Sequence, residues 1–299
     1  MDFLVACRAA DRDGYYPHVG DVQWWFRDPS LENDDKWYFC RDYHGQIVAA
    51  GLLDGSEITC VVPRGPRRRD LEAEIRAWAM RCLEDRARRQ GSGTRYAVSE
   101  QVSDDDPDRI TLLESEGFVR AAWHRLLYSR SLCNPIVEPR LPPGYTLRNT
   151  KGEAEVAKHA ALQHDAFSPY ASTTAHRYLR VMRTPGYDPW LDLVVEATDG
   201  TLAAGCICWM DDINNVGLFE PLGTRPAFRR RGLAMALMLE GLRRLKARVA
   251  VTALAAGNHP SDRGDHLPAE FTASRLIYES VGFDLVHRLS IYRKQCQIP

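Results

Sequence analysis

The sequence predicts an α/β fold, more closely an α+β arrangement with a mostly antiparallel mixed sheet, that occurs twice along the chain. Hairpin signals and apolar runs alternate with segments of helical spacing. Four short segments also recur in the same order, at offsets between 154 and 165 residues. These are Ala49-Ala50-Gly51 with Ala203-Ala204-Gly205, Arg67-Arg68-Arg69 with Arg229-Arg230-Arg231, Gly117-Phe118 with Gly282-Phe283, and His124-Arg125-Leu126 with His287-Arg288-Leu289. Matches in one order at similar offsets indicate two copies of one fold.

The length agrees with two domains, because 299 residues is about twice a typical domain of roughly 150. We place the first copy at residues 1–130 and the second at 145–299. Between them, residues 131–144 carry four prolines, at positions 135, 139, 142 and 143. Proline fixes φ and cannot donate to a sheet, so this segment is predicted to be a semi-rigid linker.

The second copy shows the clearer order of elements. Asp199-Gly200 marks a hairpin between two apolar runs. After it, Met235, Met238, Leu239, Leu242 and Leu245 recur at helical spacing. The predicted strands are 145–148, 191–197, 202–210, 216–224, 249–254 and 285–292, and the predicted helices are 153–167, a segment from 172, a segment from 233, and 273–281.

The first copy follows the same scheme. A hairpin is predicted around His44-Gly45, and a later helix carries one apolar stripe. The stripe consists of Leu71, Ile75, Trp78, Cys82 and Leu83.

Composition excludes several classes of protein. The formal net charge is −1, which argues against a dedicated nucleic-acid binder. The longest stretch without Asp, Glu, Lys or Arg is Val249–Ser261, too short and too polar for a membrane helix. We therefore expect a cytoplasmic protein with no membrane or nucleic-acid partner, present as a monomer or homodimer.

The pattern of cysteines indicates a role in core packing and not in metal binding or disulfide formation. They are scattered without C-x-x-C pairs, so neither a disulfide framework nor a metal site is expected. Cys206 and Cys208 are two apart in an apolar run, so on a strand they share one face, where burial is the expected role.

The segment from Leu222 to Met235 carries the sharpest chemical signal. It runs from a strand through a basic loop and Gly232 into a helix. A helix N-terminus presents unpaired N–H groups and the positive end of its dipole, so it suits a phosphate. Gly232 and Ala234 leave room for phosphate oxygens at the backbone, and the arginines add positive charge.

Two motifs resemble the GNAT acyltransferase superfamily. Arg229-x-x-Gly232-x-Ala234 fits the family's coenzyme A loop, [Q/R]-x-x-G-x-[G/A]. Ile277-Tyr278-Glu279-Ser280-Val281-Gly282-Phe283 fits its L-Y-x-x-x-G-F motif with Ile in place of Leu. The resemblance covers most of 145–294 and, in degraded form, the first half, and tandem GNAT chains are a known arrangement.

The resemblance implies an acetyl-CoA site in the second copy. Pantetheine would pair with the backbone of Leu222, Gly223 and Thr224. Tyr278 would protonate the departing thiolate, a role that suits a phenol, which is mostly protonated at pH 7. The alternative for Tyr278 is an aromatic ring that only packs. Pyrophosphate would lie on the loop and first helical turn: Arg229, Arg230, Arg231, Gly232, Leu233, Ala234 and Met235.

A base must take the proton of the attacking amine. Glu220 lies two and four residues before Leu222 and Thr224, so on a regular strand it shares their face. We predict Glu220 as that base, with the alternative that it only orients the substrate. His259, after the next strand, is the second candidate.

The sequence departs from the family pattern after Asn258, a further candidate coenzyme contact. Residues 259–271 form a polar stretch that we predict to be an inserted loop. It would line the substrate entrance or be a plain surface insertion.

The first copy has lost these features. Asp70 stands for Gly232, Glu72 for Ala234, and Leu113 for Tyr278. Carboxylates would repel a diphosphate, and leucine cannot donate a proton. We predict that residues 1–130 do not bind acetyl-CoA and instead wall or support the active copy.

The resulting expectation is an N-acetyltransferase that moves acetyl from acetyl-CoA to a primary amine of a small molecule or peptide, by direct attack in a ternary complex. The alternative is a non-catalytic acetyl-CoA-binding sensor or structural protein. The acceptor is not readable from sequence, although Trp190, Trp209, Tyr170, His164 and Asp165 lie in segments that could line its pocket.

Overall fold

The computed structural model describes residues 1–10, 15–90, 95–169, 173–260 and 269–297, with the backbone alone at 34, 90, 258–260 and 269–273. Within these residues the strands form one 11-stranded sheet in the order β1-β2-β3-β4-β11-β5-β10-β9-β8-β7-β6. Their bounds are β1 Trp37–Arg41, β2 Ile47–Asp54, β3 Glu57–Val61, β4 Arg95–Ser103, β5 Val119–Ser131, β6 Tyr145–Asn149, β7 Asp192–Ala197, β8 Leu202–Asp211, β9 Val216–Thr224, β10 Thr252–Pro260 and β11 Asp284–Gln297.

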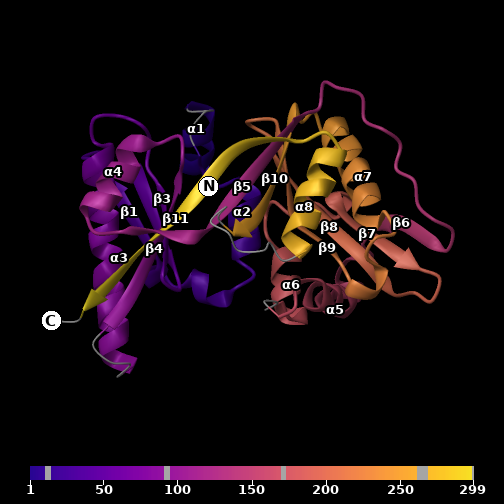
Figure 1. Cartoon of the computed structure of the whole chain (residues 1–299), viewed down its shortest axis with the longest axis horizontal. Coiled ribbons are helices and arrows are strands. Elements are labelled where there is room, and N and C mark those ends of the chain that lie inside the picture. Colours follow the sequence, from indigo (N-terminus) through magenta and orange to yellow (C-terminus); the bar gives the residue numbers. More distant parts are fainter. Residues whose placement is uncertain (11–14, 91–94, 170–172, 261–268, 298–299) are drawn as a thin grey trace.

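Helices cover both faces of this sheet (Figure 1). The α-helices are α1 Asp2–Ala10, α2 Val19–Trp25, α3 Arg68–Gln90, α4 Pro107–Ser115, α5 Val156–Phe167, α6 Ala175–Met182, α7 Leu233–Ala247 and α8 Ala269–Ser280. Short 3-10 helices are η1 Pro29–Glu32, η2 Asp34–Lys36, η3 Gly152–Glu155, η4 Pro189–Leu191 and η5 Pro226–Phe228.

The internal repeat appears as two similar half-sheets. In one half β3 runs parallel to β4, with α3 as the crossover, and in the other β9 runs parallel to β10, with α7 as the crossover. All other neighbouring strands are antiparallel. The predicted α/β fold with a mostly antiparallel mixed sheet is confirmed.

The last strand of each copy crosses into the other half. β5 lies between β10 and β11, and β11 lies between β4 and β5, so both long strands run between the two lobes (Figure 1). β5 pairs with β10 from Ser131–Thr252 to Trp123–Pro260. The division at 1–130, 131–144 and 145–299 stays a prediction, and each of the two outer segments supplies one strand to the sheet of the other.

The proline-rich segment is attached to the second copy. It has no regular secondary structure, yet Leu132 is buried and its N–H donates to the Val251 carbonyl at 2.9 Å. Ile136 and Leu141 pack against the core beneath α7. These contacts fix its course along the surface of the second half.

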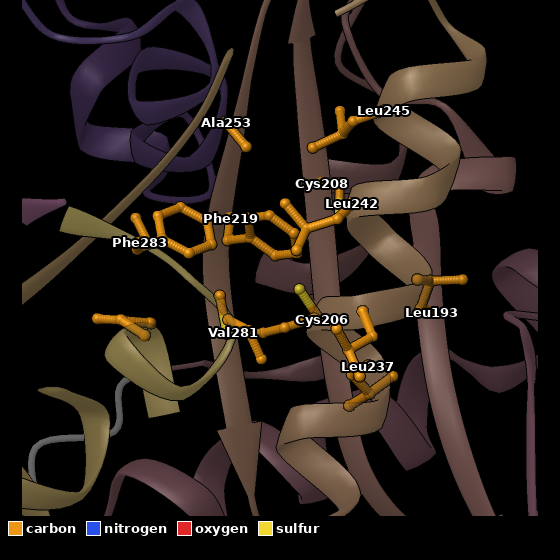
Figure 2. Close-up of a cluster of buried hydrophobic side chains, with 14 of the residues drawn as sticks. Leu193, Cys206, Cys208, Phe219, Leu237, Leu242, Leu245, Ala253, Val281 and Phe283 are labelled. Carbon is orange, nitrogen blue, oxygen red and sulfur yellow. The ribbon is translucent and has the colours of Figure 1, made fainter. Parts of the chain in front are cut away.

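The core of the second half lies between α7 and the strands β7 to β10. Leu237, Leu242 and Leu245 of α7 point onto this face, and Cys206 and Cys208 of β8 meet them (Figure 2). The prediction that the two cysteines share a buried face is confirmed. Met235 is an exception to the predicted stripe, because it is 40% exposed at the first turn of the helix.

Two predicted boundaries around β10 are wrong. The strand begins at Thr252 and continues to Pro260, and α8 begins at Ala269. His259 and Pro260 therefore belong to the strand, and residues 269–271 belong to the helix, while 261–268 lie outside the described residues. The strand is longer because β5 pairs with it along its whole length, which a local reading of the sequence cannot reveal.

None of the helices in the described part of the chain combines the length and the apolar character that crossing a membrane requires.

Candidate active site

A β-bulge in β9 organises the site. Phe219 is opposite Cys208 and Leu222 is opposite Cys206, so Glu220 and Pro221 together face the single residue Ile207. A bulge bends its strand and raises the local twist. The parallel pairing of β9 with β10 ends at Phe219–Ala255, although both strands continue. The two strands therefore part beyond the bulge.

The bulge also corrects the predicted orientation of Glu220. Leu222 packs into the core beneath α7, on the face that Phe219 occupies. Leu218, two residues before Glu220, lies on the opposite face with Trp24 and Trp209. Glu220 follows Leu218 onto this second face, so it does not share the face of Leu222 and Thr224. The extra residue in the strand changes the period-2 alternation on which the prediction depended.

Glu220 is a partly buried carboxyl among charges from several elements. Its pKa is raised to about 7, mainly by burial; Arg125 and Arg27 lower the pKa, and Asp21 adds to the rise. Its backbone carbonyl accepts a hydrogen bond from the Trp209 indole at 2.5 Å. A carboxyl with a pKa near neutrality has the property expected of a general base.

Tyr278 approaches from the other face of the sheet. It is 6% exposed and packs against Tyr128, with 5.2 Å between ring centroids. Its hydroxyl donates to the Ala256 carbonyl at 3.1 Å, in the part of β10 that has left β9. Burial and the nearby Glu220 carboxylate hold the pKa of Tyr278 well above its ordinary value, so the phenol stays protonated near pH 7.

The loop before α7 is open at the helix N-terminus. Gly232 is the N-cap residue with φ 77°, makes no side-chain cap, and has free space where a Cβ would stand. Arg230 also has a positive φ of 62°. The first N–H groups of α7 therefore have no capping side chain, which leaves them available to an anion.

The fit of a coenzyme is supported by one orphaned polar atom. Thr224 Oγ1, at the end of β9, is buried and has no hydrogen-bond partner. A buried hydroxyl without a partner is costly, and a polar ligand along the end of β9 would satisfy it. Leu222 and Gly223 precede it in the part of β9 that no longer pairs with β10.

The basic side chains divide between shaping the loop and facing solvent. Arg229 donates to the Thr224 and Ala166 carbonyls, and Arg231 donates to the Tyr145 hydroxyl at 2.6 Å and to the Ala227 carbonyl. Arg230 and Met235 are exposed beside Gly232, while Leu233 is buried and Ala234 half-buried. Arg229 and Arg231 thus hold the loop in place in addition to contributing positive charge.

The remaining residues that the sequence suggested for the site lie in several different elements. Asn258 and His259 are in β10, opposite Arg125 and His124 of β5, and their side chains lie outside the described residues, as does Tyr170. Trp209 is buried beside Glu220. Trp190 contacts Arg244. Asp165 contacts His164 and pairs with Arg225, which directly follows the end of β9.

The matching position in the first copy carries a network of ion pairs. Glu72 is 2% exposed and contacts Arg68 at 2.9 Å and Arg76 at 3.8 Å. Glu100, fully buried on β4, pairs with Arg76 and Arg109. Leu113, in the place of Tyr278, is 0% exposed and packs in the core under α3. Charged side chains thus occupy the start of the helix where the second copy is open.

Sequence reasoning missed the residues that the first copy adds to the cleft. Asp21 and Arg27 come from α2 and its end, and Arg125 from β5. The repeat marked the triplet His124-Arg125-Leu126, but it gave no sign that this triplet enters the other copy's half. Only the exchange of β5 reveals it.

Comparison with known proteins relates this chain to a family of acetyltransferases. Residues 159–263 match the model of the acetyltransferase (GNAT) family. Mycothiol acetyltransferase of Kineococcus radiotolerans is 30% identical over 212 residues, which is 69% of this chain and 66%, just under two thirds, of that relative.

Two solved structures share the fold along nearly the whole chain. A GCN5-related N-acetyltransferase from Sphaerobacter thermophilus aligns with a TM-score of 0.72 at 20% identity, over 99% of this chain and 91% of its own. A tandem GNAT protein from the clavulanic acid biosynthesis pathway aligns with a TM-score of 0.65 at 17% identity, over 98% and 93%.

The chain belongs to the GNAT family of acetyltransferases, with the family's domain in its C-terminal half and a tandem GNAT fold overall. The family uses acetyl-CoA as acyl donor and an amine as acceptor.

Proposed function

We propose that this protein is an N-acetyltransferase that transfers acetyl from acetyl-CoA to a primary amine by direct attack in a ternary complex. The observation that carries the proposal is the parting of β9 and β10, with Glu220 on one face of the gap and Tyr278 on the other. An open, uncapped helix N-terminus at Gly232 lies at the end of β9. Donor and acceptor can thus approach from opposite faces.

The two side chains have complementary proton affinities. Glu220, with a pKa of about 7, takes a proton from the substrate ammonium directly or through water, and the resulting neutral amine attacks. Tyr278, whose pKa is raised, keeps its proton and can give it to the leaving thiolate. Acetyl-CoA, when bound, supplies the activated thioester. The backbone of Leu222 to Thr224 would pair with its pantetheine arm, and the N–H groups from Arg230 to Met235 would hold its pyrophosphate.

A small-molecule amine is the favoured acceptor. The relatives that are named after a pathway or product, mycothiol and clavulanic acid, are named for small molecules. A peptide amine is the other candidate. A panel of both kinds of amine, with thiol release as readout, distinguishes them.

A sensor that binds acetyl-CoA without turnover is less well supported. Binding alone requires neither a buried phenol at the gap nor a carboxyl whose pKa lies near neutrality. The first copy is proposed not to bind acetyl-CoA, because the carboxylates of Glu72 and Glu100, in buried ion pairs, lie at its equivalent site and would repel a diphosphate.

The pH dependence of turnover tests the role of Glu220. Because the carboxylate is the active form, kcat/KM is expected to rise with pH through about 7 and then level, apart from the ionisation of the amine itself. Glu220→Gln should lower kcat/KM by about 10²-fold or more and remove that limb.

Calorimetry provides the control, since Glu220→Gln should bind acetyl-CoA as the wild type does. If the Glu220→Gln enzyme retains both full kcat/KM and the limb near pH 7, Glu220 is excluded as the base.

A further inference from the structure

A chain of polar contacts runs from the first copy into the cleft of the second. His18 caps α2: its Nδ1 accepts from Gly20 N at 2.9 Å, and its Nε2 contacts the Val216 carbonyl of β9 at 3.1 Å. Asp21 Oδ2 accepts from His18 N at 2.8 Å, and Asp21 Oδ1 accepts from the Arg125 guanidinium at 3.2 Å. Helix α2, strand β5 and strand β9 are thus tied together near Glu220.

Tight packing holds this series of polar contacts in place. A Cβ on Gly20 would lie 2.4 Å from the Trp209 side chain, so α2 lies directly against β8. Trp209 in turn donates to the Glu220 carbonyl. The side chains of Arg125 and Asp21 are 19% and 7% exposed.

The alternation of strands places Arg125 on the same side as Glu220. Leu126 and Tyr128 of β5 point into the core beneath α7, so Arg125 points to the opposite face. Arg125 is opposite Asn258 of β10, which is beyond the point where β9 and β10 part. Glu220 and Arg125 thus flank the same opening from two copies.

We propose that Arg125 is a positioning residue whose guanidinium, held by Asp21, favours the ionised form of the Glu220 carboxylate that accepts the proton of the amine. This inference rests on the proposed function. The active site is then formed by both copies. The first copy, which is proposed to bind no coenzyme, supplies the charges that control the ionisation of Glu220 in the second copy.

Other groups near Glu220 also influence its pKa. Asp21 opposes Arg125 by raising the pKa of Glu220, and Arg27, at the end of α2, lowers it. Tyr278 of α8 and Cys206 of β8 also lie within its electrostatic reach and stay neutral near pH 7, because their own pKa values are raised. Arg125 and Asp21 thus act on Glu220 with opposite signs.

The direction in which the pKa of Glu220 changes distinguishes an electrostatic role of Arg125 from a merely structural one. If Arg125 only fastened α2 to the sheet, its loss would loosen the site and hydrate Glu220, and the pKa of Glu220 would fall toward its ordinary range. If Arg125 acts through its charge, its loss raises the pKa of Glu220.

The experiment measures the acidic limb of kcat/KM in matched variants. Arg125→Met is expected to move the limb upward by about one pH unit or more, and Arg125→Lys to move it back toward the wild-type position. Asp21→Asn, which keeps an acceptor for Arg125, is expected to move it downward. Arg120→Met is the control on the same strand, because Arg120 pairs with Asp104 at 2.7 Å and is half-exposed.

A second measurement needs no substrate. In protein labelled with ¹³C-glutamate, the Glu220 carboxyl signal is identified by its absence in Glu220→Gln and titrated in each variant. If the enzyme acetylates no amine but this titration moves upward in Arg125→Met and downward in Asp21→Asn, the inference stands and the proposed function fails. An unchanged or downward titration in Arg125→Met overturns the inference, whatever the activity.

Discussion

At the scale of single residues, the proposed site rests on two side chains, Glu220 with a pKa near neutrality and Tyr278 with a raised pKa. Tyr278 comes from α8 and Glu220 from β9, and their side chains lie on opposite faces of the sheet where β9 and β10 part. The sequence predicted both residues as candidates. The bulge at Glu220 and Pro221, and hence the face that Glu220 occupies, came only from the pairing of β9 with β8.

Tyr278→Phe tests the proton donor. Phenylalanine keeps the ring that packs against Tyr128 and Phe283, and it removes only the hydroxyl that donates to Ala256. We expect kcat to fall by about 10²-fold, because general-acid assistance is lost while binding is retained. Steady-state kinetics with a thiol-release assay measures this change.

Calorimetry with acetyl-CoA checks that the Tyr278→Phe variant still binds its donor. Wild-type kcat in that variant would mean that Tyr278 only packs.

Gly232→Asp tests the coenzyme loop. The position has φ 77°, where an L side chain is strained, and a carboxylate there would face the phosphates at short range. A like-charge pair at 4 Å costs about 4 kcal/mol at an effective dielectric of 20, which corresponds to about a thousandfold in affinity for acetyl-CoA. Isothermal titration calorimetry measures the loss.

Gly45→Asp is the matched control for the loop variant. Gly45 has φ 80° and open space for a Cβ, but it lies in the β1–β2 hairpin. It should bind acetyl-CoA like the wild type. Equal affinities in the two variants would place the coenzyme elsewhere.

At the scale of elements, the equivalent helices α3 and α7 differ at their N-termini. Both helices follow a central strand and lead to the next parallel one. The start of α7 is open at Gly232, whereas the start of α3 is closed by Arg68, Glu72 and Asp106, with Arg68 bonded to both acids. The first copy thus uses charge pairs among its own side chains at the position where the second copy is proposed to bind a diphosphate.

Glu72→Ala tests the stability of that buried network. The substitution leaves Arg68, Arg76 and Arg109 without one of their acidic partners in a buried place. We expect a loss of about 3–5 kcal/mol in the free energy of unfolding, because an uncompensated buried charge is costly. Urea denaturation measures it.

Glu84→Ala on the same helix is the comparison, since Glu84 pairs with the exposed Arg88 and should change stability by about 1 kcal/mol or less. Neither variant should create a second acetyl-CoA site. A stability loss in Glu72→Ala as small as in Glu84→Ala would show that the network contributes little.

At the scale of the whole molecule, the exchange of β5 and β11 makes each half depend on the other. β11 pairs with β4 from Ser103–Leu289 to Arg95–Gln297, and β5 pairs with both β10 and β11. A cut at the linker would leave two pieces, each with a strand that belongs in the other's sheet. The interface between the halves is therefore the middle of a continuous sheet.

Deleting residues 1–130 is expected to abolish folding of the remainder. The deletion removes β5, so β10 and β11 each lose an antiparallel partner and expose unpaired backbone edges. It also removes Asp21 and Arg125. Solubility after expression, and circular dichroism of any soluble material, measure the outcome.

Co-expression of separate fragments 1–130 and 131–299 is the companion test, and we expect the two to copurify and recover activity. A soluble fragment 131–299 with full activity would show that the first copy is dispensable, against both this prediction and the composite site.

The sequence by itself determined the repeat and the mixed α/β fold, and it predicted a phosphate-binding loop at Gly232 and the candidate pair Glu220 and Tyr278. These depend on local patterns: glycine at a left-handed position, periodicity of apolar residues, and short motifs. It also showed that Asp70, Glu72 and Leu113 break the pattern in the first copy.

Only the tertiary structure decided which strand lies beside which. Strand order depends on pairing between residues more than a hundred positions apart, such as Asn258 with Arg125, and no local pattern encodes it. The exchanged strand brings Arg125 beside the cleft, and the bulge turns Glu220 toward it. The charges around the proposed base therefore come from the fold as a whole, because electrostatic effects act through space and not along the chain.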